Sequence, residues 1–329
     1  MGVSNDTLDA LTQRLARLIW SGANQAKDME NNLADLITIA VHTLLPVVLI
    51  VLLGFGLARM KAPFDQKIVG SLVSNVGYPA LILSHLAKEH ILLETFFAIL
   101  GAAALMIVLF GGLGFAALKI MRVEVKAYLP PMMLSNVGNI GLPVSTLAFG
   151  PEGTAVALGF VVIVLTAIFT IGTAIPMGRP DFRALIRQPV LYAVVLAILM
   201  MGFGWKLPQP VDQSLSLLAG LAIPLMLLTL GYSLATLKTG DLGQAAVLTA
   251  IHIGISTVTA LALTTLLSLD QTIEHVVVLL CFMPPSVATY LAVSKYRADE
   301  APGVAGFIFL STLATLITLP LVLTFWVMG

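Results

Sequence analysis

Long apolar runs, separated by short polar segments, dominate the pattern of residues along this chain. Each run holds roughly 20 mostly apolar residues, the length that a helix needs to cross about 30 Å of hydrocarbon. The runs are continuously apolar rather than alternating, which excludes the pattern of a transmembrane β-barrel. The pattern therefore predicts an all-α integral membrane protein with ten transmembrane helices. The predicted spans are about 36–58, 68–87, 95–118, 127–149, 153–178, 188–205, 213–237, 242–269, 272–294 and 302–328.

Composition and charge lead to the same class of protein. Of the 329 residues, 58% are hydrophobic and 10% are charged, whereas soluble domains carry about 25% charged residues. The formal net charge is zero and no basic stretch is present, so we expect no nucleic-acid partner. The single cysteine, Cys281, permits no internal disulfide. The spans nearly fill the chain, which excludes a soluble catalytic domain, and we expect no cofactor and no metal.

The distribution of Lys and Arg between the short loops predicts the orientation in the membrane. Twelve of these residues lie in the odd-numbered loops, such as Arg59 and Lys61 after the first span, and two lie in the even-numbered loops, Lys88 and Lys206. We therefore expect the odd-numbered loops to be cytoplasmic and both termini to lie outside.

The segment 1–35 precedes the first span and has a different pattern. Leu8, Leu11 and Leu15 fall on one face of a helix, which is typical of an amphipathic helix at the membrane interface. Met29 stands directly before the first span. Both interpretations stay open: an N-terminal amphipathic extension, or an appended or misassigned start.

The spans divide into two sets of five, 36–178 and 189–329, joined by a basic cytoplasmic linker at 179–188. Because five is odd, the second set enters the membrane from the opposite side. Similar Gly/Pro features recur in order within the two sets. They are Gly77-Tyr-Pro79 with Ala222-Ile-Pro224, and Gly141-Leu-Pro143 with Met283-Pro-Pro285. An inverted repeat whose helices are interrupted at matching positions is typical of secondary transporters, with the binding site at the breaks.

The interrupted spans 127–149 and 272–294 favour an anion site. Proline interrupts a helix, and we expect a new half-helix to begin after Pro143 and after Pro285. The first N–H groups of such a helix have no intrahelical partner and carry partial positive charge. No acidic residue occupies either break, so a carboxylate fits there. The candidate substrate-binding residues are Asn136, Asn139, Gly141, Pro143, Pro284, Pro285, Ser286, Thr289 and, from the second span, Asn75.

Two motifs in these spans resemble the bacterial branch of the auxin efflux carrier family. They are Asn136-x-Gly138-x-x-Gly141-x-Pro143, and Met283-Pro284-x-Ser286-x-Ala288 with Lys295-Tyr296. The resemblance covers about residues 36–329 and implies that the fourth and ninth spans are broken and cross at mid-membrane. It also implies a scaffold of spans 1, 2, 6 and 7, a mobile domain of the other spans that moves as in an elevator, and homodimers formed through the scaffold. The implied substrates are small organic anions such as malonate or auxin, moved across the inner membrane lipid bilayer. The chain lacks the long loop between spans 5 and 6 that the plant branch has.

The coupling ion and two other function classes stay open. Intramembrane titratable groups are candidates for proton relay, here His42 and His252, which we place near span ends. Backbone carbonyls with Asn136, Asn139, Ser286 and Thr289 are an alternative sodium site. Transport without a coupling ion is a third option. An intramembrane enzyme and a channel are the rival classes. The one dense group of candidate metal ligands, between His85 and Glu94, falls in a predicted external loop.

Overall fold

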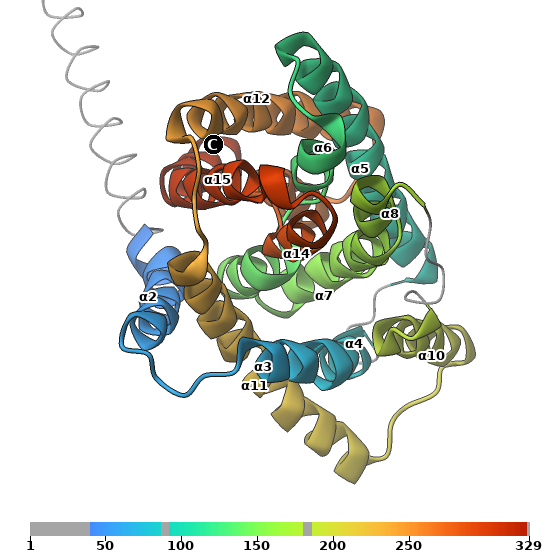
Figure 1. Ribbon diagram of the computed structural model, residues 1–329. Coiled ribbons are helices and arrows are strands. Elements are labelled where there is room, and N and C mark those ends of the chain that lie inside the picture. The colour runs from blue at the N-terminus through green and yellow to red at the C-terminus, as the bar shows by residue number, and fades with distance from the viewer. Residues whose placement is uncertain (1–39, 87–91, 180–185, 328–329) are drawn as a thin grey trace, which may run out of the picture.

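The computed structural model describes residues 40–86, 92–179 and 186–327 (Figure 1). The described residues form helices and connecting segments, with one isolated antiparallel bridge and no strand. Seven helices in these ranges are long and apolar enough to cross a membrane. The all-α class of a multi-pass membrane protein is thus confirmed. The predicted extension 1–35 and most of the linker 179–188 lie outside the described residues.

The count of ten spans and the 5+5 repeat stay predictions. Helices Pro189–Phe203 and Gln271–Cys281 are shorter than a full span, and Val137–Met177 forms a single stretch of 41 residues. A straight helix of that length would measure about 60 Å, twice the hydrocarbon thickness. The stretch is interrupted at Gly150, where φ is 62° and ψ is −148°. The interruption falls between the predicted spans 127–149 and 153–178.

One group of helices, which we call the framework group, lies along the lower part of Figure 1. Helix α11 packs along α2 and α4, and α10 packs along α4. Gly54 and Gly231 allow the close approach of α2 and α11, because a Cβ on either glycine would clash with backbone of the other helix. The members are α2 (Leu45–Arg59), α3 (Gln66–Leu72), α4 (Tyr78–Leu86), α10 (Pro189–Phe203) and α11 (Gln209–Thr236).

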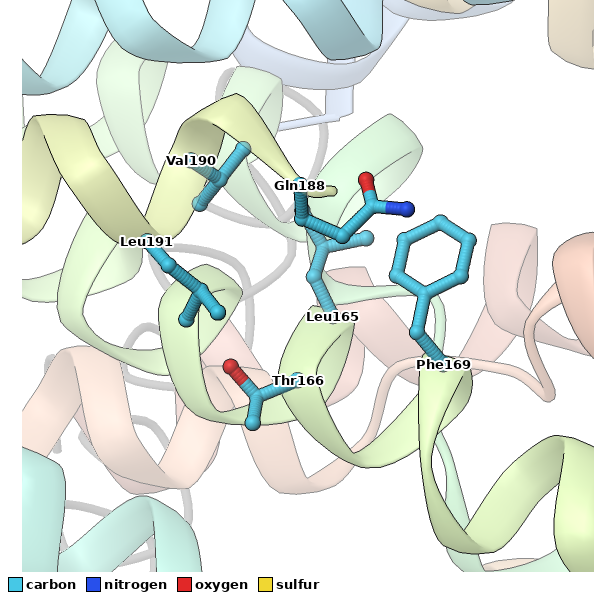
Figure 2. A pocket seen from close by; sticks show the side chains of 6 residues that line it. All are labelled: Leu165, Thr166, Phe169, Gln188, Val190 and Leu191. Atoms are coloured by element: carbon cyan, nitrogen blue, oxygen red, sulfur yellow. The ribbon is translucent and has the colours of Figure 1, made fainter. Parts of the chain in front are cut away.

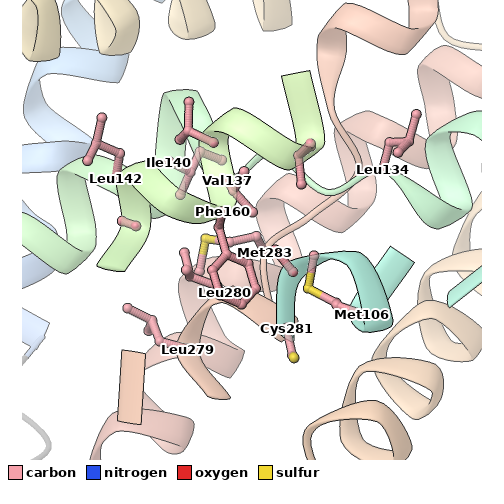
Figure 3. Close-up of a cluster of buried hydrophobic side chains, with 14 of the residues drawn as sticks. Met106, Leu134, Val137, Ile140, Leu142, Phe160, Leu279, Leu280, Cys281 and Met283 are labelled. Atoms are coloured by element: carbon pink, nitrogen blue, oxygen red, sulfur yellow. The ribbon is translucent and has the colours of Figure 1, made fainter. Parts of the chain in front are cut away.

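The other helices form what we call the crossing group, in which α12 packs along α15, and α5 packs along α6 and α7. The members are α5 (Leu93–Met121), α6 (Val125–Met133), α7 (Leu142–Phe169), α8 (Ile171–Met177), α12 (Leu242–Leu266), α13 (Gln271–Cys281), α14 (Val287–Tyr296), η4 (Ala298–Glu300) and α15 (Ala301–Val322), followed by η5 (Leu323–Val327). The two groups meet where α4 contacts α7 and where α11 contacts the turn that precedes α7. Buried apolar side chains surround that turn, among them Leu134, Phe160 and Met283 (Figure 3).

Three widened π-helical turns each end two residues before a proline. They are η1 (Ala40–Leu44) before Pro46, η2 (Val73–Gly77) before Pro79, and η3 (Val137–Gly141) before Pro143. Proline lacks the N–H that an α-helix needs and clashes with the carbonyl four residues earlier. A π-turn bonds one residue further back, as in the bond from the N–H of Tyr78 to the carbonyl of Val73. These prolines therefore widen their helices rather than end them.

Candidate functional site

The first break lies between α6 and η3, earlier in the chain than we predicted. Helix α6 ends at Met133, Leu134 is extended, and Asn136 is the N-cap of η3. Pro143 stands in the first turn of α7, which continues directly from η3. The prediction that the second half-helix begins after Pro143 is therefore wrong. The π-turn accommodates Pro143, while the side chain of Asn136, which bonds nearby backbone, competes with the helix at the break.

The second break lies between α13 and α14, where the proline pair predicts it. Helix α13 ends at Cys281, and α14 begins at Val287 with Ser286 as its N-cap. A proline restricts the preceding residue to extended conformations, so Pro284 and Pro285 together keep this segment out of a helix. Two half-helices thus begin at breaks inside the crossing group. One consists of η3 and α7, and the other is α14.

The two breaks cross and satisfy each other's backbone. The N–H of Asn136 donates to the carbonyl of Pro284 at 2.6 Å, and the N–H of Ser286 donates to the carbonyl of Leu134 at 2.9 Å. These bonds make an antiparallel bridge between Ser135 and Pro285. Unpaired backbone groups in hydrocarbon cost several kcal/mol each, so the pairing lets both helices open at one place. We call this place the crossing.

Each half-helix at the crossing is capped by its own side chain. The N–H of Asn139 donates to Oδ1 of Asn136 at 3.4 Å, and the N–H of Ala288 donates to Oγ of Ser286 at 3.3 Å. The hydroxyl of Thr289 donates to the carbonyl of Ser286 at 2.6 Å. Ser286 and Thr289 therefore serve the start of α14, whereas Asn136 uses only one end of its amide for capping.

Buried polar atoms at and beyond the first break have no partner among the described residues. Ser135 is 1% exposed and Asn136 is 2% exposed, and neither Oγ of Ser135 nor Nδ2 of Asn136 forms a hydrogen bond there. Oγ of Ser145, fully buried in α7, is also unpaired. Buried polar atoms without a partner are rare and costly. Our sequence reasoning missed Ser135, although it directly precedes Asn136 in the motif, and no pattern marks Ser145.

The remaining predicted residues of the crossing differ in what they contact. A Cβ on Gly141 would lie 2.7 Å from Cδ2 of Leu280, so this glycine lets η3 pack against α13. Pro143 is buried, and Asn139 is partly exposed. The side chain of Asn75 is exposed and donates to Oγ of Ser71 on its own helix at 2.8 Å.

The two candidate histidines occupy different environments. His42 is exposed in η1. His252 is only 3% exposed and lies well inside α12, so its expected place near a span end is wrong. Its ring meets Phe110 and Phe307 edge-on, at centroid distances of 5.4 and 5.9 Å, and its Nε2 has no partner among the described residues. The sequence alone could not predict this aromatic environment, because it does not show which helices pack against α12.

A small hollow lies elsewhere, between α7 and the start of α10 (Figure 2). Its volume of about 10 Å³ is roughly what one water molecule needs. The hydroxyl of Thr166 on its wall is already bonded to the carbonyl of Val162 at 2.7 Å. This hollow is too small for an organic substrate. The lining residues are Leu165, Thr166, Phe169, Gln188, Val190 and Leu191.

Two comparisons with known proteins bear on the identity of this chain. The pattern of a family described as "Membrane transport protein" matches residues 175–323, which include α13 and α14. The "Uncharacterized transporter MJ1031" of Methanocaldococcus jannaschii is 26% identical over 307 residues, or 86% of this chain and 97% of the relative. Both comparisons agree with the resemblance carried by the two motifs, and they support a membrane transporter that is similar to the auxin efflux carriers.

Proposed function

We propose that the chain is a secondary transporter, not an enzyme, and that it moves a small organic anion, a carboxylate such as malonate or an auxin-like acid. One observation carries the proposal. Two half-helices begin side by side at a buried crossing, and the free Nδ2 of Asn136 stands at the start of one of them.

The chemistry of the crossing favours a carboxylate over a cation. Each helix N-terminus acts as a partial positive charge, worth about 0.3–1 kcal/mol and up to ~2 kcal/mol when partly buried. The segments 134–141 and 282–289 contain no charged residue, so no acid of the chain takes up this charge. A cation would need a counter-acid that these segments lack. Amide and hydroxyl donors next to helix N-termini suit an anion that accepts several hydrogen bonds.

The proposed mechanism is alternating access in which the crossing group slides past the framework group as in an elevator. The crossing lies wholly within the crossing group, so the bound anion would travel with it. The ten-span 5+5 inverted repeat, the inner-membrane location with both termini outside, and a homodimer through the framework helices belong to the same proposal. An interior-negative potential drives an anion outward by about 2.3 kcal/mol per charge per 100 mV, so export needs no coupling ion.

Counterflow in liposomes tests this function. Purified protein is reconstituted into vesicles loaded with unlabelled malonate or indoleacetate, and entry of the labelled acid is followed. A carrier accumulates label transiently and saturates with substrate concentration. Linear, non-saturating entry would instead indicate a channel, and a changed product would indicate an enzyme. Absence of counterflow for these acids and for a panel of other small carboxylates would refute the anion assignment.

A further inference from the structure

Tyr78 extends from the framework group to the start of the half-helix at the first break. It is the first residue of α4, directly after η2, and is 4% exposed. Its hydroxyl packs against Gly138, where a Cβ would clash with the phenolic oxygen. Gly138 lies in η3, two residues after Asn136. The contact therefore joins the two groups of helices within the first turn beyond the crossing.

The base of Tyr78 is held firmly against the framework. A Cβ on the neighbouring Gly77 would lie 2.9 Å from Cβ of Ala222 in α11, so η2 and α11 are in close contact. This packing fixes the point from which the Tyr78 side chain extends. The ring can therefore place its hydroxyl reproducibly at the start of η3.

The sequence around Tyr78 indicates that packing alone does not require its hydroxyl. Asn75-Val-Gly-Tyr-Pro79 and Asn139-Ile-Gly-Leu-Pro143 share one pattern, and both contain the end of a π-turn followed by a proline. In the second segment, Leu142 occupies the position that Tyr78 has in the first segment. A buried tyrosine hydroxyl normally finds a hydrogen-bond partner, and Gly138 offers no side chain for one.

We infer that the Tyr78 hydroxyl is a substrate ligand supplied by the framework group, and that it donates a hydrogen bond to the carboxylate bound at the start of η3. The inference rests on the proposed anion transport. The free Nδ2 of Asn136 then holds the anion from the crossing group, while Tyr78 holds it from the other side of the interface. Affinity in this arrangement depends on both groups, and the contact with Tyr78 breaks when the crossing group moves.

The test is the substitution Tyr78→Phe, which keeps the ring and removes the hydroxyl. Equilibrium binding of labelled malonate and indoleacetate to the purified full-length protein is measured, together with the melting temperature without ligand. Loss of one hydrogen bond to a charged ligand should weaken binding roughly ten- to a hundredfold. The melting temperature should change little.

Tyr128→Phe is the matched control. Tyr128 is also buried, and its hydroxyl also packs against a glycine, but this glycine is Gly303 of α15 and lies away from the crossing motif. This variant should keep wild-type affinity even if its melting temperature falls. Unchanged or tighter binding in Tyr78→Phe, with a binding-competent wild type, would overturn the inference alone. A wild type that binds no small carboxylate would overturn the proposed function together with it.

Discussion

Replacing Asn136 by aspartate separates the two tasks of its side chain. Oδ1 of Asn136 caps η3 by accepting from the N–H of Asn139, and Nδ2 has no partner among the described residues. Aspartate keeps the size and the capping acceptor. It removes the donor and brings negative charge to the place where we expect the anion. Stability without ligand and affinity for a carboxylate should therefore respond differently to this one change.

The expected sizes follow from the geometry. A hydrogen bond to a charged group contributes about 1.5–3 kcal/mol, or roughly ten- to a hundredfold in affinity. Two like charges about 4 Å apart near a protein surface repel by about 4 kcal/mol, which adds about another thousandfold. A good N-cap contributes about 0.5–2 kcal/mol to stability, and a carboxylate at a helix N-terminus adds about 0.3–1 kcal/mol. Asn136→Asp should thus remain folded and lose measurable binding.

Asn136→Ala is the comparison that completes the experiment. Alanine removes the cap and the donor together, so the melting temperature of this variant should fall. Its affinity for the carboxylate should drop by the amount that one hydrogen bond contributes. Melting curves without ligand and equilibrium binding of malonate and indoleacetate at pH 8 provide both readouts. Wild-type affinity in Asn136→Asp would refute the anion-site reasoning. A melting temperature of Asn136→Asp below that of Asn136→Ala would refute the capping role.

Three further experiments test the site, the topology and the buried histidine. Pro143→Ala restores an N–H and lets the π-turn close to α-helical spacing, turning η3 by about 100° relative to α7; carboxylate uptake should fall while the protein stays folded, and unchanged uptake would contradict the argument. In a Cys281→Ser background, a cysteine at Glu152 should react with an impermeant maleimide from outside and one at Arg179 should not; the reverse labelling would invert the topology. Because its neighbours are aromatic rings, His252→Asn should lower the melting temperature and leave the pH dependence of uptake unchanged, whereas loss of that dependence would assign it the coupling proton.

The class of the fold and the second break could be predicted because their causes are local. Continuous apolar runs suffice to predict membrane helices. Two adjacent prolines, Pro284 and Pro285, prevent a helix whatever surrounds them. A single proline is less decisive, since a widened turn can absorb it, as at Pro143. The sequence therefore indicates the motif around the first break but not the residue at which the helix opens.

The roles of individual side chains depend on neighbours that are distant in the sequence. Gly138 needs to be a glycine because Tyr78 packs against it. Gly141 needs to be a glycine because Leu280 packs against it. His252 looks like a titratable group in a span, and only the fold places it between two phenylalanines. The free Nδ2 of Asn136 becomes visible only when the other bonds of the crossing have been assigned.

The division of hydrogen bonds at the crossing suits the proposed carrier, which would have to return unloaded. The backbone bonds from Asn136 to Pro284 and from Ser286 to Leu134 are internal, so the two broken helices are held together without a ligand. Among the described residues, the atoms of the crossing without a partner are Oγ of Ser135 and Nδ2 of Asn136, and each costs about 1–3 kcal/mol when unsatisfied. The carboxylate that we propose to bind there would offset this cost without rearranging the backbone. Binding energy is thereby separated from the backbone bonds of the crossing, and changes that remove only the unpaired donors should lower affinity more than they lower stability.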